Sequence, residues 1–470
     1  MDWIGLGSIA LYQLLEKFLK NSTAYIVGGL TLLIPIQMAA QNWTDHSRAG
    51  RYVAPDSAYN LLQSVAKNGI LFTNGDNDTF PLWYIQEVEG VRTDVRVLCL
   101  SYVNTDWYID QMYKQMNESP ALPLSLKREQ YVGQAKQSLG TGQRKTISMS
   151  LPVDRNKLLT DGIISEKDLP SLQAPMKWEV PTRGGGNTYL ELKDVLILNL
   201  LENVAKGGWE RPVYFANTVS PGSFLGLSNY LRLEGLAYRV LPVKRAKVND
   251  PYARADGYID IERMDSALTS VFRYRNLAEE GVYYDENIQR MLGNYYNIFY
   301  RLSDAYLRRA DNYQGLNNRL RQQLTDGSIT NADSLNAVIS ANQNIANASR
   351  NRAKEVMLFA DAKFPYTVTP PDPFLLARAG VMLDRIGEKD LSKTYLDYAE
   401  EKALGTLNYY YTVGEEFPKA AFYYSALQVC NQHYGQQAQL EQAAGGGEKY
   451  WQEKYANLIG QMQVLQSTVR

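Results

Sequence analysis

Two aspartates stand at a point where an apolar strand is predicted to give way to a helix. Asp76 and Asp78, with Asn77 between them, follow the apolar run at residues 70–73. Carboxylates in such a turn can accept hydrogen bonds from a sugar hydroxyl, bind a cation or act in acid–base chemistry. They can also cap the following helix, a role that contributes about 1 kcal/mol. Capping explains Asp78, which precedes the helical pattern, but one cap needs one carboxylate, so Asp76 is left over.

Polar side chains also follow two other predicted strands. Asn104 and Asp106 come after DVRVLCLSYV, and Asn217 and Ser220 come at the end of RPVYFANTV and just beyond it. Ligands of open α/β sheets collect beyond the carboxyl ends of the strands, so parallel strands would bring these groups together. Asp106 is also suited to cap a helix that starts at residue 107. The predicted ligand site comprises Asp76, Asn77, Asp78, Asn104, Asp106, Asn217 and Ser220, with no catalytic residue assigned.

Charge balance and the rarity of cysteine and histidine argue against several classes of function. Lys and Arg total 49 against 50 for Asp and Glu, which gives no reason to expect a nucleic-acid partner. Cys99 and Cys430 are the only cysteines, too few for a disulfide framework or a zinc site, and both are expected to be buried. His46 and His433 are the only histidines, which disfavours Ser-His or Cys-His catalysis. No cofactor and no metal site are predicted.

Helical patterns alternate with apolar strands from residue 52 to about 250. A helix capped by Asp56 precedes the strand ILFTNG, and a helix capped by Asp78 leads to the strand DVRVLCLSYV. Residues 105–139 are predicted to be largely helical and residues 153–187 to form a loop-rich insert. The alternation predicts an α/β domain at 52–250 with an open, mostly parallel sheet.

Strand patterns end near residue 260, and residues 260–470 are predicted to form a helical domain. Residues 372–404 have small residues at the spacing of one tetratricopeptide helical hairpin, while no second 34-residue unit fits, so an irregular tetratricopeptide-like array is expected. Tyrosine is abundant, with 34 residues, and its clusters near 294–300, 407–413 and 421–427 are interpreted as core or interface packing rather than a carbohydrate-binding surface.

An uncharged, mostly apolar run at residues 24–40 lies near the lower length limit for a membrane-spanning helix. The chain ahead of it contains Asp2 and lacks a short basic start, which favours one transmembrane helix at about 24–41 over a cleaved signal peptide. Lys17 and Lys20 precede the run, so the positive-inside rule places the N-terminus in the cytoplasm. Residues 1–51 are therefore expected to be a membrane-proximal segment, with residues from about 42 to 470 on the outer side.

Three long stretches resemble the C-terminal half of a known family. They are NWTDHSRAGRY, ILFTNGDNDTFPLWYIQEVEGVRTDVRVLCLSYVNTDWYIDQM and RPVYFANTVSPGSFLGLSNYLRLEGLAYRVLPV. This is a family of large bacterial membrane proteins, first described as a domain of unknown function and related to GT-C glycosyltransferases of the protein O-mannosyltransferase type. The resemblance covers roughly residues 24–430. It implies a bacterial inner-membrane protein whose residues from about 42 onward are periplasmic and end in helical repeats.

The resemblance also implies what this chain lacks. In the family a multi-span N-terminal half looks like a transferase that uses a polyprenyl-phosphate sugar donor. The acidic residue that GT-C enzymes use as general base lies near the start of the parent protein, and no position here corresponds to it. The chain by itself is therefore expected to transfer no sugar, and the donor is expected only for the parent enzyme.

Three functions follow from these observations. The first is the extracytoplasmic portion of a GT-C-like glycosyltransferase, whose partners are the membrane, the multi-span half, and an acceptor protein or glycan. The second is a membrane-anchored scaffold that binds a protein partner through its helical repeats. A hydrolase that uses Asp76, Asp78 and Asp106 is the third and has the least support, because the sequence does not fix the separation of the carboxylates.

Overall fold

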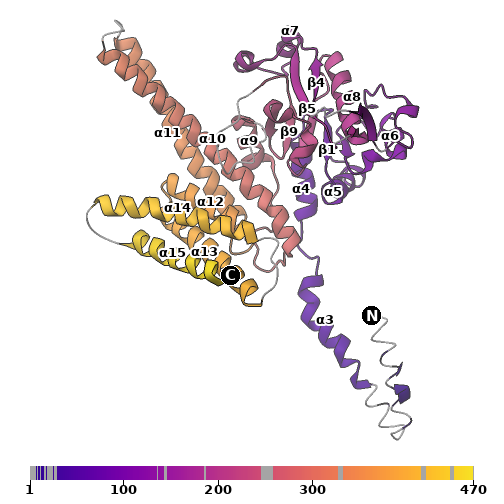
Figure 1. Ribbon diagram of the computed structural model, residues 1–470, viewed down its shortest axis with the longest axis vertical. Coiled ribbons are helices and arrows are strands. Elements are labelled where there is room, and N and C mark those ends of the chain that lie inside the picture. The colour runs from indigo at the N-terminus through magenta and orange to yellow at the C-terminus, as the bar shows by residue number, and fades with distance from the viewer. Residues whose placement is uncertain are drawn as a thin grey trace.

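The computed structural model describes residues 29–134, 136–141, 146–184, 187–244, 258–326, 332–413, 420–444 and 449–468, with a few single positions before residue 29. Figure 1 shows an α/β part, coloured indigo to magenta, beside a part built from long helices, coloured orange to yellow. The predicted fold class, a parallel α/β arrangement followed by an all-helical region, is confirmed.

A six-stranded sheet forms the centre of the α/β part. Its strand order is β10-β8-β9-β7-β1-β2. β1 pairs in parallel with β2 and with β7, and β10 pairs in parallel with β8, while β9 is antiparallel to both of its neighbours. The strands are β1 (Ile70–Thr73), β2 (Arg96–Cys99), β7 (Val213–Ala216), β8 (Leu231–Glu234), β9 (Ala237–Val240) and β10 (Tyr258–Ile259).

The parallel part of the sheet is buried on both faces. All four residues of β1, of β2 and of β7 are buried, as continuous apolar strands covered by helices require. The helices of this part are α4 (Val53–Gln63), α5 (Asp76–Glu87), α6 (Asp106–Met112) and α8 (Leu192–Lys206), of which α5 contacts β2 and α4 contacts α5. α8 ends at Lys206, and Gly207 is its C-cap.

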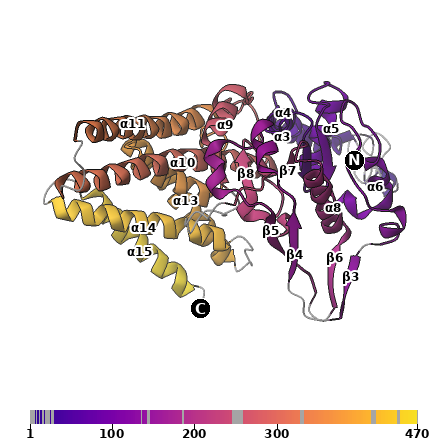
Figure 2. The same cartoon turned by 90° about the horizontal axis from the view of Figure 1, so that it is seen from above.

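The sequence prediction for the segment between β2 and α8 is wrong in part. Residues 105–139 are not largely helical: α6 ends at Met112, and a long irregular stretch follows up to the short 3-10 helix η2 (Arg128–Gln130). Two strand pairs then extend away from the six-stranded sheet (Figure 2). They are β3 (Lys136–Thr141) with β6 (Asn187–Glu191), and β4 (Thr146–Leu151) with β5 (Met176–Pro181). The segment between β4 and β5 contains α7 (Arg155–Thr160) and η3 (Glu166–Ser171).

Long helices make up the rest of the chain. The short helix α9 (Ile261–Ser266) and the π-helical turn η6 (Ala267–Val271) lead into them. α12 (Pro373–Arg385) and α13 (Lys389–Val413) form the predicted hairpin. Leu396 of α13 approaches Gly380 of α12 so closely that a Cβ on Gly380 would lie 2.8 Å from Leu396 Cγ. Figures 1 and 2 both show α10 and α11 side by side. The long helices are α10 (Glu286–Thr325), α11 (Ala332–Lys363), α12 (Pro373–Arg385), α13 (Lys389–Val413), α14 (Ala420–Ala444) and α15 (Tyr450–Thr468).

Polar contacts of α4 join the two parts. The side chain of Asn60 is fully buried, donates to Arg273 O over 2.9 Å and to Tyr295 OH over 2.8 Å, and accepts from Arg273 N over 2.7 Å. Asp56 accepts from Arg275 N over 2.9 Å and pairs with its guanidinium. Asp56 is therefore not the predicted N-cap of α4, whose N-cap is Tyr52, but an anchor for the chain that leads into α10.

The apolar segment near the N-terminus contains α3 (Leu33–His46), which projects away from both parts (Figure 1). A single spanning helix at 24–41 is not confirmed: within the described residues, no helix is at once long enough and apolar enough to cross a membrane. Residues 24 and 26–28 of the predicted span lie outside the described part.

Candidate functional site

The carboxyl ends of β1, β2 and β7 lie next to one another, because both neighbours of β1 run parallel to it. The loops that follow these strands therefore meet, as the sequence predicts. Ser101 Oγ, after β2, donates to Asn74 O, after β1, over 2.7 Å. The outer parts of these loops are exposed to solvent, so the meeting point is accessible to a ligand.

Asp76 belongs to the first turn of α5 and faces the loop after β2. Tyr102 OH donates to its Oδ1 over 3.0 Å. This hydrogen bond to a carboxylate raises the pKa of Tyr102. The carboxylate is exposed, and Tyr102, in the 3-10 helix η1 (Tyr102–Asn104), fixes its orientation. Sequence reasoning missed Tyr102, because it lies near the end of DVRVLCLSYV, which is predicted to be a strand throughout.

Asp78 contacts the loop after β7 instead. Thr218 Oγ1 donates to Asp78 Oδ2 over 2.6 Å, and Asn74 N lies 3.4 Å from the same oxygen. Burial raises the pKa of this carboxyl, and the two hydrogen bonds partly offset that effect. The predicted capping role is wrong in its position, since α5 begins at Asp76 and its N-cap is Gly75. Asp78 thus lies inside the first turn and joins two loops.

The remaining predicted site residues do not all converge. Asn104 Oδ1 accepts from Lys193 N over 3.3 Å, so it contacts the first turn of α8. Asp106 is the first residue of α6, with Thr105 as N-cap, and accepts from Trp107 N over 2.8 Å. Ser220 is exposed and precedes the short 3-10 helix η4 (Pro221–Phe224). Of the predicted site residues, Asn77, Asp78 and Asn217 line one cavity, whereas Asp76 contacts Tyr102 and Asn104 contacts α8.

A small cavity of about 60 Å³ lies behind Asp78, between the two parts of the molecule. Asn77, Asp78, Asn217 and Thr218 line it from the α/β part. Tyr295, together with Met291 and Asn294, lines it from α10. This volume suits a few water molecules rather than a sugar or peptide, so ligand contact is expected on the exposed side of the loops.

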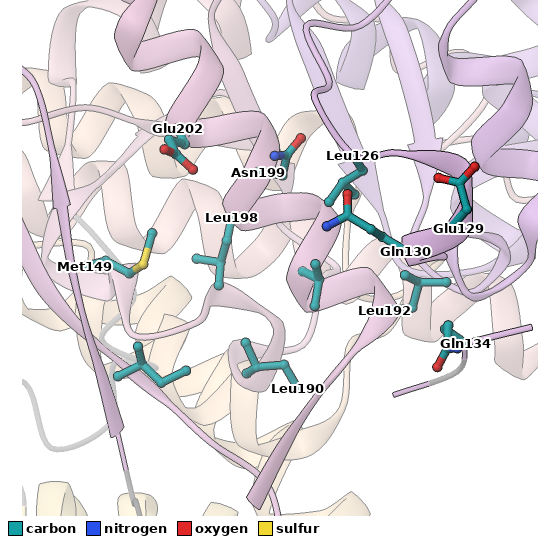
Figure 3. Close-up of a pocket in the computed structure, with 12 residues that line it drawn as sticks. Leu126, Glu129, Gln130, Gln134, Met149, Leu190, Leu192, Leu198, Asn199 and Glu202 are labelled. Carbon is teal, nitrogen blue, oxygen red and sulfur yellow. The ribbon is translucent and has the colours of Figure 1, made fainter. Parts of the chain in front are cut away.

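A larger cavity of about 570 Å³ lies between α8 and the projecting strand pairs (Figure 3). Its floor is aliphatic, with Leu190, Leu192 and Leu198, and Met149 of β4 faces it. Glu129, Asn199 and Glu202 stand at its margin, and the described residues that line it include no Lys or Arg.

Metal-dependent chemistry receives no support from side-chain grouping. Throughout the part of the chain that the structure describes, no group of three or more His, Cys, Asp or Glu is placed to hold a metal ion. Cys99 and Cys430 are buried, as predicted, and burial raises the pKa of the Cys430 thiol. Asp76 and Asp78 contact different loops, so they do not form one acid–base pair that faces a common point.

Comparison with protein families finds a match in the α/β part. Residues 54–149 and 145–263 match the family model described as TMEM260-associated domain 2. The match supports a TMEM260-related family. The TMEM260-associated region contains all six strands of the main sheet and the loops of the candidate site. Comparisons with curated proteins and with solved structures find no significant match.

Proposed function

We propose that this chain is the extracytoplasmic acceptor- or glycan-binding portion of a GT-C-like membrane glycosyltransferase and is not catalytic by itself. The observation that carries the proposal is the meeting of three loop ends at the carboxyl edge of β1, β2 and β7. There an exposed carboxylate, Asp76, is held by Tyr102, and Asp78 is held by Thr218. Such an edge binds ligands in open α/β sheets, and carboxylates accept hydrogen bonds from hydroxyls and amides.

The link to glycosyl transfer rests on the resemblance of the loop sequences to the GT-C-related family. The match to TMEM260-associated domain 2 covers residues 54–263, which include the loops of the candidate site. Sugar transfer belongs to the multi-span half of the proposed parent protein, which would supply the general base and bind the polyprenyl-phosphate donor. The role of this chain is to hold the acceptor near that half.

Membrane attachment forms part of the proposal. Large apolar side chains of α3 are exposed, including Ile34 at 54%, Ile36 at 62% and Trp43 at 75%. An apolar helix that projects into solvent is unfavourable unless a bilayer or another protein covers it. We therefore propose that α3 and the residues before it contact the inner membrane, with the two large parts on the periplasmic side. A reporter fused after Arg51 tests this topology, because activity in the cytoplasm would contradict it.

The binding role is tested with the purified chain. It is offered polyprenyl-phosphate sugars together with candidate acceptor proteins and glycans, and both binding and product formation are measured. The expected result is binding of an acceptor or glycan without transfer. Robust transfer by residues 1–470 alone would contradict the noncatalytic role. The lack of any acceptor or glycan binding would contradict the binding role.

A protein-interaction scaffold is the second candidate, favoured by apolar side chains exposed on the helical part. Tyr409 of α13 is 61% exposed, and Phe422 of α14 is 51% exposed. The two candidates place binding on different parts of the molecule. Phe422→Ser is expected to abolish partner binding if the scaffold is correct, whereas Asp76→Asn is expected to weaken binding if the loop edge is the site.

A further inference from the structure

Four aromatic side chains form a row on the surface beside Asp76. The row consists of Phe80, Trp83, Tyr102 and Trp107. Successive ring centroids are 5.7 Å, 6.2 Å and 6.3 Å apart. Phe80 is 47% exposed and Trp107 is 52% exposed, while the two rings between them are half-buried. Single exposed apolar side chains are common on proteins, whereas a contiguous group of them marks an interaction site.

The sequence places these rings on two helices and a turn. Asp76, Phe80 and Trp83 are spaced i, i+4 and i+7 on α5, so they share the face of the helix that points away from the sheet. Tyr102 lies in η1 after β2, and Trp107 lies in the first turn of α6. The row therefore runs along the same edge of the sheet as the candidate site.

A buried tyrosine supports the row from beneath. The ring of Tyr108 lies 5.8 Å from that of Tyr102 and 5.5 Å from that of Trp107, in edge-on contact with both. Its hydroxyl accepts a hydrogen bond from Cys99 N over 3.0 Å, which ties it to the end of β2. Because Tyr108 is buried, its fixed position limits the movement of the rings above it.

Polar groups border the row. The hydrogen bond from Tyr102 uses Asp76 Oδ1, and within the described residues Oδ2 makes no hydrogen bond, so it remains available to a ligand. The amide side chains of Asn74 and Asn77 are also exposed at the same turn. Amides both donate and accept hydrogen bonds, whereas a carboxylate only accepts.

This combination matches the chemistry of a sugar ring. A pyranose has a face of C–H groups that packs on an aromatic ring, and a rim of hydroxyls that both donate and accept hydrogen bonds. We propose that the row of Phe80, Trp83, Tyr102 and Trp107 stacks pyranose rings of a neutral oligosaccharide, while Asp76 and the neighbouring amides bind its hydroxyls. This inference rests on the proposed function and specifies its ligand as glycan. A cationic peptide is the competing ligand, but the neutral amides and the engagement of Asp76 by Tyr102 favour a polyol.

The test uses the full chain and isothermal titration with neutral linear hexaoses of glucose and mannose. A Lys- and Arg-rich peptide is titrated in parallel. Trp107→Ala is expected to weaken hexaose binding by about tenfold or more, because it removes an exposed ring from the row. Trp107→Phe is expected to retain most of the affinity, since a ring remains. Trp43→Ala is the matched control, because Trp43 is an exposed tryptophan of α3 outside the row.

Several outcomes would overturn the inference. Equal affinities for wild type and Trp107→Ala, with both proteins folded by circular dichroism, would show that the row does not bind the sugar. Binding of the cationic peptide without any hexaose would replace the proposed ligand. If the chain binds an acceptor protein and Trp107→Ala does not change that affinity, the aromatic row is not the binding site. The proposed function would still stand in that case. If the wild-type chain binds neither an acceptor protein nor a glycan, both this inference and the proposed function are refuted.

Discussion

Thr218 Oγ1 donates a hydrogen bond to Asp78 Oδ2 over 2.6 Å and joins the loop after β7 to the first turn of α5. Removal of either partner breaks the same contact. We expect Asp78→Ala and Thr218→Val each to lower the free energy of unfolding by about 1 kcal/mol. The double variant is expected to lose less free energy of unfolding than the sum of the losses in the two single variants. Urea unfolding measures the three values, and strictly additive losses would contradict a direct contact.

The stability of this turn is expected to depend on pH. Burial raises the pKa of Asp78, so the folded protein binds a proton there at a higher pH than the unfolded chain does. The ionised carboxylate therefore costs stability above its folded pKa, and protonation removes that cost as the pH falls toward about 4. Asp78→Asn is expected to be at least as stable as wild type at neutral pH. The difference in free energy of unfolding between Asp78→Asn and wild type, measured with urea, should become smaller as the pH falls to 4. A difference that grows over this range would contradict the account.

Asn60 is expected to couple the two parts of the molecule. Asn60→Leu keeps a similar volume but leaves the backbone N–H and C=O of Arg273 without their partner, at a cost of about 1–3 kcal/mol. We expect calorimetry to show lower stability and a separate transition for the helical part. Asn156→Leu, at an exposed position of α7, serves as the control. A single transition at the temperature of wild type would refute this role.

Gly226 is expected to tolerate no side chain. Its φ is +82°, and a Cβ there would lie 2.2 Å from the carbonyl oxygen of Glu179. Gly226→Ala is therefore expected to cost more than about 2 kcal/mol. Gly90 has φ +67° with nothing within 4 Å, so Gly90→Ala should cost only the backbone strain of about 1–2 kcal/mol. Equal losses for the two variants in urea unfolding would show that the close approach has no effect.

The architecture could be predicted because burial leaves a direct mark on the sequence. β1, β2 and β7 are apolar at every position or nearly so, and helical patterns separate them. Their parallel pairing then explains why the following loops meet. The order of the strands could not be read in this way, because long-range pairing has no local pattern.

Local details of the site were less predictable. The sequence allows either Asp76 or Asp78 to cap the start of the helix. In the structure the N-cap is instead Gly75, whose backbone is extended. The wrong assignment of Asp78 followed from assuming that the carboxylate before the helical pattern is the cap. Its hydrogen bond with Thr218 joins residues 140 positions apart, which no local pattern indicates.

The aromatic row was missed for a different reason. The spacing of Asp76, Phe80 and Trp83 can be read from the sequence, but periodicity does not say which face of α5 packs on the sheet. The structure buries Thr79, Leu82, Ile85 and Gln86 and so exposes the aromatic face. The tyrosine cluster at 294–300, by contrast, packs in the core as predicted, with Tyr295 and Tyr296 buried.

Asp76→Asn tests most directly whether the loop edge of the α/β part is the ligand site. The Kd of an acceptor or glycan and the free energy of unfolding are measured for this variant, with Glu118→Gln as an exposed carboxylate control outside the site. We predict binding weaker by about fivefold or more, because an acceptor of ligand hydrogen bonds is altered, and a stability within about 0.5 kcal/mol of wild type. Unchanged binding per folded molecule, with a loss of stability as large as that of Asp78→Ala, would show that the turn is structural and contradict the account.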